Sequence, residues 1–122
     1  MQLERTEEVV VTEEVLEMVA QRPFRRMRLQ DHPDLKGRGI YSIWFGKLCL
    51  YVGKAEISLR QRLAQHWESC HNRRLKSFLN IYGGKITFRY FLEEGSWSPR
   101  DFKEYEQKFM DLYQPLTNRR RA

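Results

Sequence analysis

Apolar and polar residues follow one another along the chain in blocks that predict both strands and helices. Residues 39–45 and 48–53 are apolar at nearly every position, which is typical of central strands covered on both faces. Only Gly46 and Lys47 separate these runs, so the pattern predicts a tight β-hairpin. A third strand is predicted at residues 85–92, where polar and apolar side chains at first alternate.

Four segments with the apolar spacing of a helix accompany these strands. Three of them begin beside a serine or threonine suited to cap a helix N-terminus. The predicted helices cover residues 13–21, 59–67 and 73–82, and the last begins at Pro99. We therefore expect an α+β fold, an α/β sandwich with a small three-stranded sheet flanked by about four helices.

The length of 122 residues suits one compact core and is too short for two. We assign residues 1–36 to an N-terminal helix with a basic connector and residues 37–122 to the functional domain. Residues 22–38 contain two prolines, a glycine and six basic side chains, so irregular surface structure is expected there.

The charge of the chain is unevenly distributed. The net charge is +6, yet residues 1–21 hold one arginine and six glutamates, a net charge of −5. Residues 22–122 hold 21 basic and 10 acidic residues, a net charge of +11. The positive charge of residues 22–122 favours a polyanionic partner such as nucleic acid, because each cation placed beside a phosphate releases a counterion. An ordinary solvated surface is the alternative.

Several classes of protein are not expected from this sequence. Cys49 and Cys70 have no closely spaced partner and no zinc-type spacing with histidine, so neither a disulfide framework nor structural zinc is predicted. No apolar run approaches the length of a membrane helix, and the glutamate-rich N-terminus does not resemble a signal peptide. We expect a cytoplasmic, nucleoid-associated protein with no membrane partner.

A carboxylate on an apolar stripe is the first sign of chemistry. Glu106 lies four residues after Phe102 and three before Phe109, on the predicted inward face of the last helix. Burying a carboxylate is costly unless a cation faces it, so we expect a metal ion or a basic side chain opposite. A lone carboxylate suits Mg²⁺, which keeps several waters. Alternatively, Glu106 reaches water or pairs with Lys103 or Lys108.

Other side chains suit phosphate chemistry. Arg62 and His66 lie four residues apart on one predicted helical face, where a guanidinium can neutralise phosphate oxygens and a histidine can bind phosphate or a tyrosine hydroxyl. Tyr41 and Tyr51 can act as bases only if a cation such as Lys54 favours the phenolate. Each residue alone has an ordinary explanation: an exposed helix cation, a structural histidine or a core tyrosine ring.

The order of these residues carries a resemblance. Gly39-Ile40-Tyr41, then Tyr51-Val52-Gly53-Lys54, then Arg62 on a helix, then Glu106 with Pro115 and Asn118, is similar to the GIY-YIG nuclease family over residues 37–118. The second element has Val52 where the family's name has isoleucine, and the connector before Ser58 is one residue longer than in the repair branch. The resemblance implies a three-stranded antiparallel sheet and hydrolysis of phosphodiester bonds with one Mg²⁺ or Mn²⁺.

The resemblance also implies roles for particular residues. The catalytic set would be Tyr41, Tyr51, Arg62, His66 and Glu106, with Glu106 binding the metal. One of the two tyrosines would help to deprotonate the attacking water, and the sequence does not choose between them. The resemblance places two further residues at the site, Lys54 and Asn118.

We expect a metal-dependent endonuclease that binds nucleic acid mainly through its backbone, with DNA rather than RNA as the expected substrate and limited sequence specificity. Basic side chains near the domain supply the expected phosphate contacts: Arg25, Arg26, Arg28, Arg73, Arg74 and Lys76. A catalytically inactive nucleic-acid-binding or protein-interaction module on the same fold is the alternative, and a homodimer or a partner protein stays open.

Overall fold

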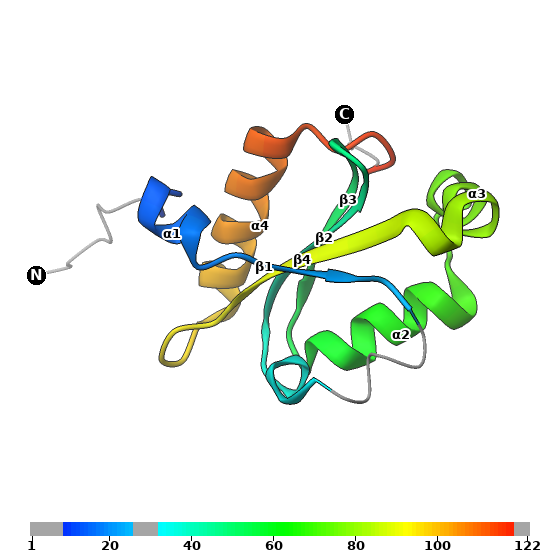
Figure 1. Ribbon diagram of the computed structural model, residues 1–122. Coiled ribbons are helices and arrows are strands. Elements are labelled where there is room, and N and C mark those ends of the chain that lie inside the picture. Colours follow the sequence, from blue (N-terminus) through cyan, green and yellow to red (C-terminus); the bar gives the residue numbers. More distant parts are fainter. Residues whose placement is uncertain (1–8, 26–31, 119–122) are drawn as a thin grey trace, which may run out of the picture.

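A computed structural model gives the fold of the chain and describes residues 9–25 and 32–118. Figure 1 shows a twisted sheet with helices packed against it. The sheet has four antiparallel strands in the order β1-β4-β2-β3. The strands are β1 Ala20–Pro23, β2 Gly39–Phe45, β3 Leu48–Ala55 and β4 Ile86–Leu92. The helices are α1 Glu13–Glu17, α2 Leu59–Ser69, α3 Arg73–Tyr82 and α4 Pro99–Tyr113, with short 3-10 turns η2 Pro33–Lys36 and η3 Gly83–Lys85.

The expected hairpin is confirmed. β2 and β3 pair from Gly39 with Ala55 to Phe45 with Leu48, and the register shifts between Ile43 and Trp44. Gly46 supplies the turn with φ +59°, a conformation that favours glycine. The α+β class is confirmed as well, and the strand predicted at residues 85–92 pairs with β2 from Phe45 to Gly39.

The number of strands predicted from the sequence is wrong: the sheet has four strands, not three. The extra strand, β1, lies within segments assigned to a helix and to an irregular connector, and it pairs with β4 from Ala20 opposite Tyr90 to Pro23 opposite Thr87. Helix α1 accordingly ends at Glu17 instead of reaching Gln21. Because β1 shares a sheet with strands beyond residue 37, the two assigned parts of the chain are joined structurally, and the division itself stays a prediction.

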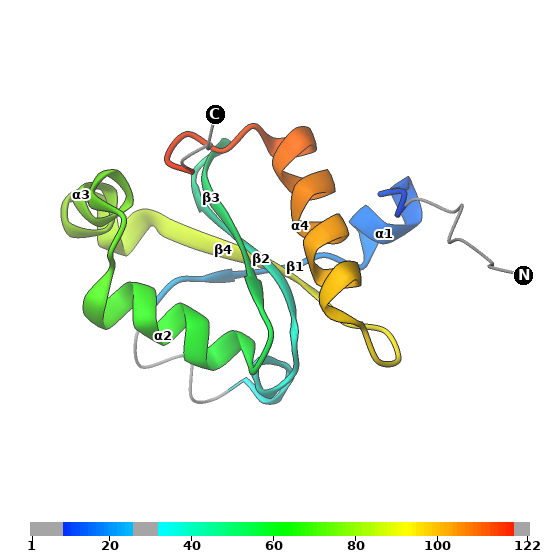
Figure 2. The ribbon, with the colours of Figure 1, turned by 180° about the vertical axis from the view of Figure 1, so that it is seen from behind.

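Helices cover both faces of the sheet. On one face, α4 and α1 pack through an aromatic cluster that includes Trp44, Phe91, Phe102 and Phe109. On the other face, α2 and α3 pack on a cluster that includes Ile43, Leu63, Leu75 and Phe88. The two views in Figures 1 and 2 show α4 beside α1, and α2 with α3 away from them. In the described part of the chain, no helix has the length and apolar character needed to cross a membrane.

The C-terminal segment covers the outer edge of β3. The backbone N–H groups of Leu116 and Thr117 donate to the carbonyls of Cys49 and Leu50, at 3.0 and 2.8 Å. The side chain of Asn118 then pairs with the backbone of Val52 in both directions, at 2.8 and 2.9 Å. The backbone groups of β3 that face outward between Cys49 and Val52 are therefore paired by the C-terminal segment instead of lying open at the edge of the sheet.

Gly39 allows β2 to lie against β4. A Cβ at this position would overlap the backbone carbonyl of Phe91, which cannot move without breaking the strand pairing. We predict that Gly39→Ala lowers the free energy of unfolding by about 1–3 kcal/mol, the usual cost of overpacking. Urea denaturation measures this change. Gly84→Ala is the matched control, because a Cβ there meets nothing within 4 Å, and equal stability losses for both variants would contradict the prediction.

Candidate active site

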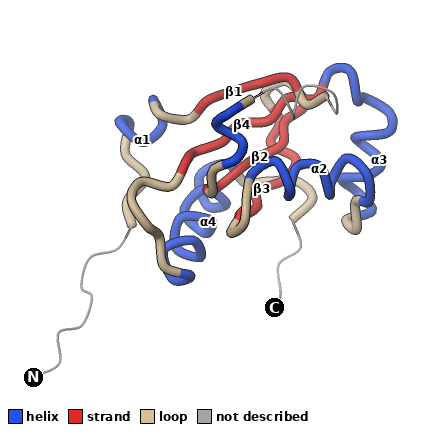
Figure 3. The backbone as a smooth tube through the Cα atoms, turned by 90° about the horizontal axis from the view of Figure 1, so that it is seen from below, coloured by secondary structure: helices blue, strands red, loops and turns tan. Residues whose placement is uncertain are grey.

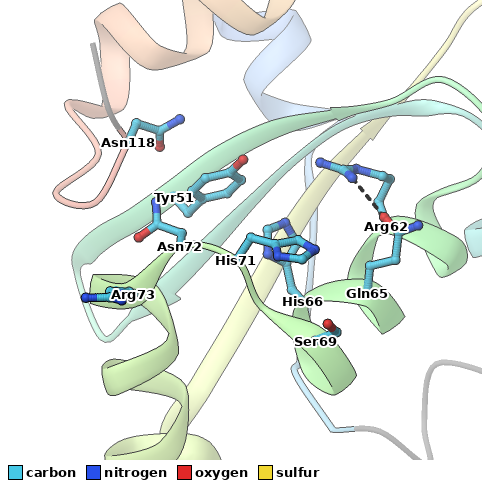
Figure 4. A pocket seen from close by; sticks show the side chains of 9 residues that line it. All are labelled: Tyr51, Arg62, Gln65, His66, Ser69, His71, Asn72, Arg73 and Asn118. Carbon is cyan, nitrogen blue, oxygen red and sulfur yellow. Dashed lines mark hydrogen bonds between the residues drawn. The ribbon is translucent and has the colours of Figure 1, made fainter. Parts of the chain in front are cut away.

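Two hollows meet along β3, where helices from the two faces of the sheet approach each other. The larger one has a volume of about 880 Å³ and the smaller one about 350 Å³. Arg62 and Gln65 of α2 line both, so the hollows form one cleft with two arms. Figure 4 shows the larger arm, with side chains from β3, α2, the α2–α3 connection and the C-terminal segment around it. Glu106 of α4 lines the smaller arm together with Lys54.

Tyr41 lines neither arm of the cleft and is buried beside His66, which lines the larger arm. The Tyr41 side chain is 1% exposed, and its hydroxyl lies 2.6 Å from Nε2 of His66. The ring passes over Gly53 of the partner strand, where any Cβ would overlap the phenol. Position 53 must therefore be glycine, since the Tyr41 ring fills the space that any side chain there would occupy. Burial raises the pKa of Tyr41 well above its usual value, while the Arg62 guanidinium opposes the rise.

Tyr51 is the tyrosine that faces the cleft. It lines the larger arm and is only partly buried. Its ring lies 6.1 Å from the Tyr41 ring and 4.8 Å from the His66 ring, measured between centroids. Burial raises its pKa, and the charge of Arg62 acts in the opposite direction. At neutral pH both phenols are therefore protonated, and Tyr51 is the one within reach of a substrate.

His66 is held neutral at neutral pH. Burial lowers its pKa to about 4, and the charges of Arg62 and His71 add to this effect. Its position on α2, one turn after Arg62, points the ring at both tyrosines, as the edge-to-face arrangement with each of them shows. A neutral imidazole has one bare nitrogen, so His66 can accept a proton or a hydrogen bond from a phenol.

Arg62 lies where the two arms meet. Its guanidinium donates to Oε1 of Gln65 at 2.8 Å, an interaction drawn in Figure 4. It also affects the pKa values of Tyr41, Tyr51, His66 and Glu106, so its charge reaches every predicted catalytic group. Gln65 fixes the orientation of the guanidinium and leaves other N–H groups for a phosphate.

Glu106 fits a divalent cation. Burial raises the pKa of its carboxyl, Lys54 and Arg62 lower it, and Glu56 raises it. Within residues 9–25 and 32–118, no hydrogen bond or ion pair holds this carboxylate directly. The described residues also contain no group of three His, Cys, Asp or Glu side chains able to hold a metal. One partly buried carboxylate beside an open hollow suits Mg²⁺ or Mn²⁺, which retain most of their waters.

The two further residues placed at the site by resemblance both lie at the cleft. The Lys54 ammonium is 3.5 Å from the Glu56 carboxylate in the smaller arm. Asn118 lines the larger arm, but its amide pairs with the Val52 backbone on both its oxygen and its nitrogen. The structure thus gives Asn118 a positioning contact, and its predicted contact with nucleic acid stays a prediction.

The six basic residues expected to contact phosphate do not lie together. Arg73 lines the larger arm. Arg74 and Lys76 are exposed on α3 outside the lining, and Arg25 is exposed just after β1. Arg26 and Arg28 lie outside the described residues. The basic side chains of α3 therefore extend away from the cleft, as a surface for a long polyanion would.

Sequence reasoning missed several side chains that line the larger arm. These are Gln65, Ser69, His71 and Asn72. Gln65 follows Arg62 by three residues, a helical spacing that could have indicated the contact. Asn72 accepts a hydrogen bond from the backbone of Leu75 as the N-cap of α3 and donates to the Thr117 carbonyl at 2.7 Å, and this second contact leaves no trace in local sequence.

A comparison with known protein families gives a match. The model of the GIY-YIG catalytic domain matches residues 37–121, more than half of the chain. The chain belongs to the GIY-YIG family. Searches of curated proteins and of solved structures found no significant match.

The GIY-YIG fold is of a nuclease type, and members of the family are generally endonucleases. The GIY-YIG motifs provide Tyr41 on β2 and Tyr51 on β3, at the positions where those strands flank the cleft.

Proposed function

We propose that this GIY-YIG protein is a metal-dependent endonuclease that hydrolyses phosphodiester bonds in DNA. The observation that supports it most is the convergence of Tyr51, Arg62 and Glu106, from β3, α2 and α4, on one cleft. β3 and α2 follow one another in the chain, whereas α4 comes from a distant part of the sequence and packs on the other face of the sheet. A phenol, a guanidinium and a partly buried carboxylate provide proton transfer, anion binding and cation binding for one reaction.

Glu106 would hold a single Mg²⁺ or Mn²⁺ in the smaller arm. The cation, when bound, polarises a phosphoryl oxygen and stabilises the leaving oxygen. Glu106 itself supplies the negative charge that keeps the cation in place, and the basic side chains of Lys54 and Arg62 face the phosphate that enters beside it. Because Arg62 lines both arms, it would bind the scissile phosphate at their junction.

The tyrosines and His66 form a chain that can move a proton. The attacking water would give a proton to the Tyr51 oxygen as the Tyr51 hydroxyl proton passes to Tyr41. The Tyr41 proton would then pass to Nε2 of His66, 2.6 Å away, leaving hydroxide to attack phosphorus. Burial and Arg62 disfavour the resulting imidazolium, and the negative charge of the bound phosphate favours it.

The lining of the larger arm favours a nucleic-acid backbone. Among the residues that the structure describes, the lining contains arginine, histidine, asparagine, glutamine, serine and tyrosine, and no aspartate or glutamate. Such a surface accepts phosphates without reading base edges, so it supports limited sequence specificity. Arg73 at its far end leads to Arg74 and Lys76 on α3, which extends the positive surface beyond the cleft.

A plasmid-nicking assay tests the proposed function. We expect supercoiled DNA to become nicked with Mg²⁺ or Mn²⁺ and to stay intact with EDTA, as read on an agarose gel. An RNA transcript of the same sequence is the control for DNA preference. Binding of the plasmid without nicking, with either cation, would contradict the proposal and favour a non-cleaving nucleic-acid-binding module. Neither binding nor nicking would favour a protein-interaction module.

A further inference from the structure

A thiol lies beside the His66 ring, next to Nδ1. Cys70 follows His66 by one helical turn at the end of α2, and its Sγ is 3.7 Å from Nδ1 of His66. The same Sγ is 3.5 Å from the backbone carbonyl oxygen of Asn72. These separations are hydrogen-bond distances for sulfur, so the thiol connects the histidine to the main chain.

The backbone carbonyl of Asn72 is a fixed acceptor. The Asn72 side chain caps α3 through Leu75 and donates to the Thr117 carbonyl, so the residue is held from two sides. A carbonyl oxygen can only accept a hydrogen bond. The Cys70 thiol therefore donates its S–H to this oxygen and leaves sulfur lone pairs toward His66. Burial raises the pKa of Cys70, which keeps the thiol protonated at neutral pH.

The direction of the hydrogen bond between Cys70 and His66 follows from the hydrogen bond between Cys70 and the Asn72 carbonyl. A sulfur whose proton is engaged elsewhere can only accept, so Nδ1 of His66 must carry the imidazole proton. A neutral imidazole with a protonated Nδ1 has a bare Nε2. Tyr41 must then donate its hydroxyl proton to Nε2 across 2.6 Å, and its oxygen lone pairs face Arg62 and Tyr51.

We propose that Cys70 is a positioning residue that selects the His66 tautomer with protonated Nδ1 and bare Nε2. The residue acts through His66 and does not contact the substrate. Its catalytic consequence rests on the proposed function, because only a bare Nε2 can accept the proton that Tyr41 passes on. The tautomer itself is a property of the folded protein and can be measured without any substrate.

Nuclear magnetic resonance of ¹⁵N-histidine-labelled protein at pH 7 tests the tautomer. Protonated and bare imidazole nitrogens have separate ¹⁵N shifts, and the His66→Gln variant identifies the signals of His66 among the three histidines. We expect the wild-type protein to show protonated Nδ1 and bare Nε2 at His66. A protonated Nε2 in the wild-type protein would overturn the proposal, and this measurement needs no variant at Cys70.

Two substitutions test the part played by the thiol. Cys70→Ser keeps a donor and an acceptor, so it is expected to keep the wild-type tautomer. Cys70→Ala removes the acceptor, so signals of the other tautomer are expected to appear. Unchanged His66 signals in Cys70→Ala would overturn the proposal. If Cys70→Ala does not fold, Cys70→Ser still tests the proposal. Loss of the wild-type His66 tautomer in a folded Cys70→Ser protein would contradict the role of Cys70.

Cleavage kinetics give a second readout. We expect kcat of Cys70→Ala to fall about tenfold, as when a partner that orients an active-site histidine is lost, with KM unchanged and activity restored in Cys70→Ser. A wild-type kcat in an alanine variant whose tautomer has changed would contradict the relay through His66 and leave the tautomer assignment intact. Absence of cleavage by the wild-type protein would count against the proposed function alone.

Discussion

Glu106→Gln is expected to lower the rate of DNA cleavage by about a thousandfold. A metal ion supplies several kcal/mol of charge stabilisation to a phosphoryl-transfer transition state, and each 1.36 kcal/mol is a factor of about ten in rate. Glutamine keeps the size of the side chain and removes the charge that would hold the cation. The partly buried position of Glu106, among Lys54, Glu56 and Arg62, leaves no neighbouring carboxylate with the same burial to replace it.

Single-turnover cleavage and calorimetric titration with Mn²⁺ measure the two effects of Glu106→Gln. Cleavage and cation binding should be lost together, while binding of DNA in the absence of metal is retained. The matched control is Glu104→Gln on the same helix, where the carboxylate pairs with Arg100 at 2.9 Å outside the cleft. Cleavage at the wild-type rate in Glu106→Gln would exclude this site as the catalytic centre.

Arg62→Ala is expected to reduce the single-turnover rate by about a hundredfold or more, the usual cost of removing a group that stabilises transition-state charge. The guanidinium lies where both arms of the cleft meet, and its charge opposes the rise in the pKa of Tyr41. Arg62→Lys should give an intermediate rate, because an ammonium keeps the charge and loses the planar fork that binds two phosphate oxygens.

Arg60→Ala is the matched control for Arg62. It removes the same charge from α2 two residues earlier, at a position that lines neither arm of the cleft. Rates measured at saturating DNA separate a catalytic loss from weaker binding. If Arg60→Ala and Arg62→Ala slow cleavage equally, the effect of Arg62 is general attraction of the polyanion, and its place at the scissile phosphate is wrong.

The sequence predicted the elements that depend on neighbouring residues alone, namely the hairpin and the capped helices. The hairpin follows from two apolar runs around Gly46, and α2 and α4 begin after the serines expected to cap them, Ser58 and Ser98. Strand β1 could not be found in this way. Its polar side chains are exposed, and its partner β4 lies more than sixty residues away in sequence, so only the tertiary pairing defines it.

In the candidate site, too, contacts between residues close in sequence were predictable, and contacts between distant segments were not. Arg62 and His66 share a helical face by spacing alone, and the family resemblance placed Glu106 at the same site. The position of α4, which carries Glu106, on the opposite face of the sheet from α2 is seen only in the structure. The pairing of Asn118 with Val52 was not predictable, because it depends on how the C-terminal segment meets an edge strand. The sequence identified Gly53 as part of a motif. The structure shows why this position is glycine: the ring of Tyr41 occupies the space that a side chain would need.

The part of the chain that supports the candidate site is larger than the part that matches the family. Phe24 follows β1, outside the matched residues, and its fully buried ring lies 5.2 Å from that of Trp67, which directly follows His66 on α2. Figure 3 shows β1 running along the outer side of the sheet. Phe24 thus supports α2, the helix that carries Arg62 and His66. A fragment trimmed to the family match would keep every residue of the candidate site and lose both Phe24 and β1.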